Sequence, residues 1–275
     1  MYQSLKSLQL SARRQVHTLL SGHHFSKLQG EISDFSELRE YQAGDDIRKI
    51  HWMISAKRMT PYIRESHAYR EISVALVALM DGSLYFAQGN DKQRKLAEIA
   101  TILGYACEEQ DNLFRGFCYT QNQEFITPPT KQLDTINQFS KTLFEASLLH
   151  SSLDNHVAIK RLFAHLSRPS LVFILSDFLK EIDLSLLAQK HEVLCIIVRD
   201  KEEEMPKIET EATLLCPTDN TQTHARLSTG NIKKYLKNLK KHDEKLVTHF
   251  SKYGICYVKI RTDEDSVKKL RLLFD

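Results

Sequence analysis

The sequence predicts an α/β protein with a doubly wound, mostly parallel sheet in three layers, preceded by an N-terminal helix and an extended arm. Segments 72–80, 171–175 and 193–198 are nearly continuous apolar runs, which are typical of strands covered on both faces. Amphipathic segments separate these runs, as in sheets built from strand–helix–strand units. We therefore expect a sheet domain at residues 71–275 and a helix and arm at residues 1–70, packed on that domain.

The other elements follow from hydrophobic spacing and turn residues. Leu96, Ile99 and Leu103 repeat at helical spacing, and Gly254 stands where a glycine commonly ends a helix. Acidic residues crowd segment 200–211, which predicts a solvated loop. Helices are predicted at residues 5–20, 91–109, 133–149, 157–166, 184–188, 231–253 and 263–273, and strands at 61–70, 72–80, 113–119, 124–127, 171–175, 193–198, 212–216 and 255–260.

The composition excludes several classes of protein. The 275 residues are 42% hydrophobic and 27% charged, with 9 Gly and 6 Pro, which excludes collagen-like, low-complexity and disordered chains. A net charge of +3 is too balanced to indicate a nucleic-acid partner. The five cysteines form no C-x-x-C pair, and the longest apolar run, Val74–Met80, is too short to span a bilayer. Because the first residues also lack the apolar segment of a secretory signal, we predict a cytoplasmic location.

Two of the predicted strands end in carboxylates. Asp81 and Ser83 follow the first apolar run, and Ser176 and Asp177 follow the second. Ligand sites of open parallel sheets form at the carboxyl ends of the strands. If the two strands are neighbours, these side chains offer hard oxygen ligands suited to Mg²⁺ or Mn²⁺. The alternative is that both aspartates only cap the turns that follow the strands.

The same residues carry a resemblance. Asp81-Gly82-Ser83-Leu84-Tyr85 resembles the first motif, Asp-x-Ser-x-Ser, of the metal-ion-dependent adhesion site of the von Willebrand factor A fold, and Ser176-Asp177 resembles its last motif. Tyr85 stands in place of the second motif serine. Ser151 and Ser152 are the candidates for the middle threonine. The resemblance implies a degenerate site in which Asp81, Ser83 and Asp177 hold a divalent ion.

A charged block further upstream resembles a family signature. Residues 37–52, followed by Ser55-Ala56-Lys57, are similar to the signature of the bacterial domain-of-unknown-function 58 family. Its members carry this block before a von Willebrand A-like domain and often accompany MoxR-type AAA+ ATPases. The resemblance thus implies such an ATPase as the partner. The signature residues here are Arg39, Glu40, Asp45, Asp46, Arg48 and Trp52.

Two interpretations of this block are open. Asp45 and Asp46 are suited to the start of a helix, on which Arg48 and Trp52 would share one face. The block is then an ion-pair and packing lock for the arm, with the indole as its anchor. Alternatively, Arg39 and Arg48 form a clamp for phosphate or carboxylate. We favour the lock, because opposite charges alternate within the block.

The sequence therefore predicts a protein-interaction or adaptor module rather than an enzyme, working with a MoxR-type ATPase in protein assembly or maturation. One alternative is a metal-dependent phosphoester hydrolase in which Asp81 and Asp177 hold the ion. Against it, no His stands within a few residues of either strand end, and no Gly-rich phosphate loop or G-x-S-x-G motif occurs. A third possibility is binding of nucleic acid or an anionic surface through the exposed lysines of the predicted helix 231–253, which are Lys233, Lys234, Lys237, Lys240, Lys241 and Lys245.

Overall fold

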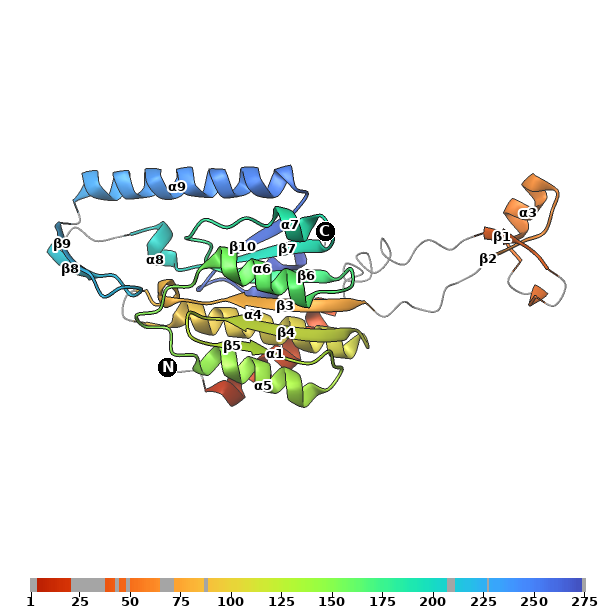
Figure 1. Ribbon diagram of the computed structural model, residues 1–275, viewed down its shortest axis with the longest axis horizontal. Helices are drawn as coiled ribbons and strands as arrows, with labels where there is room; N and C mark the ends of the chain where they lie inside the picture. The colour runs from red at the N-terminus through yellow and green to blue at the C-terminus, as the bar shows by residue number, and fades with distance from the viewer. Residues whose placement is uncertain are drawn as a thin grey trace.

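A six-stranded sheet forms the centre of the computed structural model, which describes residues 4–20, 38–42, 45–47, 50–64, 72–86, 89–206, 211–226 and 228–273. The strand order is β10-β7-β6-β3-β4-β5, and every neighbouring pair is parallel except β4 with β5 (Figure 1). The predicted α/β fold with a mostly parallel sheet is confirmed. The strands are β3 (Ser73–Leu79), β4 (Leu113–Tyr119), β5 (Glu124–Ile126), β6 (Leu171–Ser176), β7 (Glu192–Arg199) and β10 (Cys256–Arg261).

Helices cover both faces of the sheet, which gives three layers. Alternate residues of a strand point to opposite faces, so each face of β3 enters a different apolar core. Val74, Leu76 and Ala78 pack with α1 (Leu5–Leu20), α4 (Asp91–Glu109), α5 (Leu133–Glu145) and α10 (Ser266–Arg271). Ala75, Val77 and Leu79 pack with α6 (Asn155–His165), α7 (Ser185–Ala188) and α9 (Thr229–Lys252).

The acidic segment after β7 differs from its prediction. It begins with a short helix, α8 (Lys201–Glu204), in which the carboxylate of Asp200 accepts from Glu202 N and the Glu203 side chain accepts from Asp200 N. Glu203 is only 4% exposed, so the predicted solvated loop is wrong for this part. The predicted strand at 212–216 is observed as β8 (Glu211–Leu215), and it pairs with β9 (Gln222–Arg226), a strand that the sequence did not predict.

The charged block forms a small unit of its own elements, β1 (Leu38–Glu40), α3 (Trp52–Arg58) and β2 (Tyr62–Arg64), with β1 antiparallel to β2. Asp45 Oδ2 accepts from Gln42 N at 2.8 Å and closes a turn, rather than capping an α-helix. The α-helix begins later than predicted, at Trp52, where the ring of His51 caps it.

The predicted roles of several signature residues are not tested by the observed contacts and stay predictions. Glu40 accepts a hydrogen bond from Tyr62 Oη at 3.3 Å, which links β1 to β2. Asp46 lies exposed next to the turn. Arg48 and the side chain of Arg39 lie outside the described residues. The indole of Trp52 is 67% exposed, and its role as an anchor on the sheet domain stays a prediction, as does the domain boundary at residue 70.

Gly116 of β4 allows close packing of α5 on the sheet. A Cβ at this position would lie 2.6 Å from Cδ2 of Phe139, which is buried. We expect Gly116→Ala to destabilise the protein by about 1–3 kcal/mol, because the added methyl overpacks the core. Urea unfolding followed by circular dichroism measures this change.

The matched control is Gly230→Ala in the first turn of α9, where the nearest atom to an added Cβ, Ser228 Oγ, is 3.9 Å away. It should leave the midpoint of unfolding almost unchanged. Equal midpoints for Gly116→Ala and the wild type would show that α5 does not pack against β4 in this way.

Candidate functional site

The candidate site lies at the carboxyl ends of β3 and β6. The two strands are parallel neighbours, with Val74 opposite Leu171 and Ala78 opposite Leu175. Asp81 and Asp177 follow these strands, so both carboxylates lie at the same edge of the sheet, where open α/β sheets bind their ligands. They are 7% and 4% exposed, respectively, and therefore need partners for their charges.

Asp81 begins a single 3-10 turn, η2 (Gly82–Leu84). Its Oδ1 accepts from Ser83 N at 2.9 Å and from Ser83 Oγ at 2.5 Å. Gly82 N donates to Ser151 O at 2.9 Å, and a Cβ on Gly82 would lie 2.2 Å from Pro217 O. Only glycine fits this contact, which brings the turn between β8 and β9 against the site.

The second oxygen of Asp81 pairs with a lysine. Lys180 Nζ donates to Asp81 Oδ2, to Ser152 Oγ at 2.9 Å and to Leu153 O at 3.2 Å. Ser152, a candidate for the middle threonine, is in turn held by a hydrogen bond from its N–H to Gln121 Oε1 at 2.6 Å. Asp81 and Ser152, two of the predicted oxygen ligands, therefore bind one ammonium group. Ser83 is linked to this group through its hydrogen bond to Asp81.

Asp177 is paired with a different lysine. Its Oδ2 lies 3.2 Å from Lys92 Nζ, which lies 2.6 Å from Glu203 Oε1. All three side chains are at least 95% buried, so this is a desolvated ion triad. Asp177 Oδ1 accepts from Leu179 N, and Ser176 Oγ accepts from Phe178 N. The site thus contains two separate carboxylate–lysine groups.

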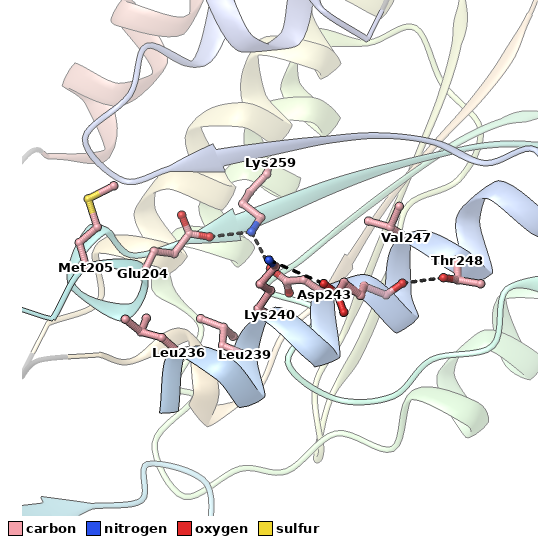
Figure 2. Close-up of a pocket in the computed structure, with 10 residues that line it drawn as sticks. Glu204, Met205, Leu236, Leu239, Lys240, Asp243, Val247, Thr248 and Lys259 are labelled. Atoms are coloured by element: carbon pink, nitrogen blue, oxygen red, sulfur yellow. Dashed lines mark hydrogen bonds and ion pairs between the residues drawn. The ribbon is translucent and has the colours of Figure 1, made fainter. Parts of the chain in front are cut away.

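Charge pairs continue along the same edge of the sheet to β7 and β10. Arg199 at the end of β7 lies 3.1 Å from Asp243 of α9. Lys259 of β10 bridges Asp243 at 2.6 Å and Glu204 at 2.7 Å (Figure 2). Burial opposes the charge of Lys259, but the hydrogen bonds that it donates to Asp243 and Glu204 outweigh burial and raise its pKa. This network fastens α8 and α9 to the sheet.

A hollow of about 630 Å³ lies over this network, between α8, α9 and β10 (Figure 2). Met205, Leu236, Leu239 and Val247 form its apolar part. The nearby Tyr235 is 42% exposed, and the partial burial of its phenol raises the pKa of that group to about 12. The six lysines predicted to face solvent on this helix are all exposed.

The observed contacts do not fit a resident divalent ion. Among the described residues, no group of three or more His, Cys, Asp and Glu side chains could hold a metal ion. Both aspartates have their charges balanced by ammonium groups. Tyr85, in place of the second motif serine, packs against the core that contains α4. The assignment of Mg²⁺ or Mn²⁺ to Asp81, Ser83 and Asp177 therefore finds no support in these contacts.

Sequence reasoning missed the cations of this site. Lys92 stands among the buried residues of α4, where a lysine so far from solvent needs an anionic partner. Lys180 follows Asp177 by three residues, and Glu203 was assigned to a solvated loop. The only sequence signal was the lysine within the buried face of α4, because the partners come from segments far apart in the chain.

Comparison with known families identifies the chain. Residues 37–245 match the family described as "Protein of unknown function DUF58". The chain belongs to this family. Uncharacterised proteins of Mycobacterium tuberculosis and Mycobacterium bovis are 29% identical to it over 216 residues, which cover 74% of this chain and 67% of each relative.

Among solved structures, the chain is similar to the conserved hypothetical protein BatB from Bacteroides thetaiotaomicron, with 11% identity and a TM-score of 0.40. It is also similar to an aerotolerance-related membrane protein from Bacteroides fragilis, with 8% identity and a TM-score of 0.41. Each match covers 74% of this chain and 96% of the other.

The cytoplasmic location predicted from the sequence is corrected. The structure from Bacteroides fragilis and a further similar one from Vibrio fischeri, with 12% identity and a TM-score of 0.21, bear the names of membrane proteins. In the part of the chain that the structure describes, no helix is long and apolar enough to cross a bilayer. The lack of such a helix, on which the prediction was based, does not establish a location.

The buried triad supplies a test of the site's energetics. We expect Lys92→Met to destabilise the protein by about 3–5 kcal/mol, because it leaves Asp177 and Glu203 as buried carboxylates without a cation. Urea unfolding at neutral pH measures the loss.

Lys240→Met is the matched control. Its ammonium is 4.0 Å from Glu244, and both side chains are largely exposed. A surface pair of this kind contributes about 0–1 kcal/mol, so the midpoint should hardly move. If both variants had the same small effect, the triad would not be the desolvated group described above.

Proposed function

We propose that this protein is a protein-interaction module that works with a MoxR-type AAA+ ATPase in the assembly or maturation of other proteins. The contact surface is the group of polar side chains of Asp81, Ser83, Ser152 and Lys180, which we call the crevice after the predicted site. This group resembles the adhesion site of von Willebrand A domains. The choice of an ATPase as partner rests on the resemblance of the charged block to its family.

One observation carries this proposal: the polar groups of the crevice bind one another and still reach the surface. Ser152 is exposed, and the side chain of Lys180 is 35% exposed, whereas that of Asp81 is 8% exposed. A polar surface held in place by its own hydrogen bonds is preorganised, so a partner that docks on it does not have to order it. This favours recognition of another protein.

The same contacts weigh against the hydrolase alternative. A general base needs a carboxylate or imidazole that is able to take a proton from water. Both oxygens of Asp81 and both oxygens of Asp177 already accept hydrogen bonds or pair with lysines. No described contact in the crevice favours proton transfer, so we do not carry the hydrolase forward as a second function.

Binding to the purified MoxR-type ATPase of the same organism tests the proposal. We expect the wild-type protein to bind in biolayer interferometry, and Ser152→Tyr to weaken binding at least tenfold. The added phenol ring would cover the crevice from an exposed position, without filling any buried space.

Ser167→Tyr is the matched control, because Ser167 is exposed in the loop before β6, at the opposite edge of the sheet. It should bind as the wild type does. No binding by the wild type, or equal binding by the wild type and Ser152→Tyr, would contradict the proposal. Turnover of p-nitrophenyl phosphate that Asp81→Asn abolishes would replace it by the hydrolase.

A further inference from the structure

The ammonium of Lys180 has a complete set of partners. A lysine ammonium has three N–H donors, and that of Lys180 meets three acceptors from separate parts of the chain: Asp81 Oδ2, Ser152 Oγ and Leu153 O. These oxygens come from the loop after β3 and the loop before α6. Lys180 itself follows β6. One side chain therefore joins three loops at the edge of the sheet.

Asp81 is also one of the groups that the resemblance assigns to a divalent ion, and Ser152 is a candidate for another. We propose that the Lys180 ammonium takes the place of that ion, so that the crevice is complete without Mg²⁺ or Mn²⁺ and excludes both. The inference deepens the proposed function and rests on it for what it says about a partner. The surface on which the partner docks would present a fixed monovalent cation, the Lys180 ammonium.

The charges in the crevice agree with this assignment. Asp81 is balanced by Lys180, and Asp177 shares Lys92 with Glu203. A divalent ion at Asp81 would lie within contact distance of the Lys180 ammonium, and like charges in a partly buried site repel strongly. The ion could bind only after Lys180 had left its three acceptors.

The fold holds Lys180 in this position. Phe178, two residues before it, has a φ of +50°, which a bulky residue rarely adopts. Its ring packs edge-on against Phe250 with the centroids 5.9 Å apart, and its carbonyl oxygen lies 2.7 Å from His242 Nε2. Both partners belong to α9, so this helix fixes the turn from which Lys180 extends.

Manganese binding followed by electron paramagnetic resonance tests the inference without any partner. We expect the wild type to bind no Mn²⁺ tighter than ~1 mM, the weak end of cation sites in proteins. Lys180→Ala removes the ammonium group from Asp81 and Ser152 and should bind Mn²⁺ at least tenfold more tightly than the wild type. Adding Asp81→Asn to that variant should remove the gain.

Lys190→Ala is the matched control. Lys190 lies just before β7, at the other edge of the sheet, and its ammonium donates to Leu166 O. This variant should therefore behave as the wild type. If Lys180→Ala fails to fold, Lys180→Gln removes the charge with a side chain of similar length, and the same gain is expected.

Mn²⁺ binding by the wild type that Asp81→Asn abolishes would overturn the inference. So would a folded Lys180 variant that gains no binding. Because the assay contains no ATPase, its result is separate from the test of the proposed function. If the protein did not bind the ATPase, the assignment of Lys180 would still stand. If the assignment of Lys180 failed, binding to the ATPase would still be open to its own test.

Discussion

The site depends on the neutralisation of carboxylates that the fold buries at one edge of its sheet. β3 and β6 are covered on both faces, so the residues that follow them leave the sheet with little access to water. A buried carboxylate without a cation is very costly, and the chain supplies a lysine for each. Lys92 approaches Asp177 from the start of α4, and Lys180 approaches Asp81 from the turn after β6. The loops at this edge are ordered around these two ammonium groups.

This arrangement links the site to elements that lie outside it. Glu203, which completes the triad of Lys92, belongs to α8. The next residue of this helix, Glu204, binds Lys259 of β10. The turn that carries Lys180 is held by α9 through Phe178. Movement of α9 would therefore reach the crevice through a short series of direct contacts.

The sequence predicted the sheet domain well because its signals are local. Long apolar runs identified β3, β6 and β7, and helical spacing identified α1, α4 and α9. Strand β9 and the burial of Glu203 escaped prediction. Short polar strands give no clear period, and an acidic stretch carries no sign that one of its members faces a lysine more than a hundred residues earlier.

By itself, the sequence determined that two apolar strands of an α/β protein are followed by Asp81 and Asp177, because strand ends follow from hydrophobic pattern. That these two strands are neighbours was decided by the tertiary structure. The sequence also determined the family, through the charged block and the strand-end motifs. Only the tertiary structure decided which cations face those carboxylates. Ion pairing across a fold depends on how loops and helices from distant segments converge, and the spacing of residues along a chain does not record that convergence.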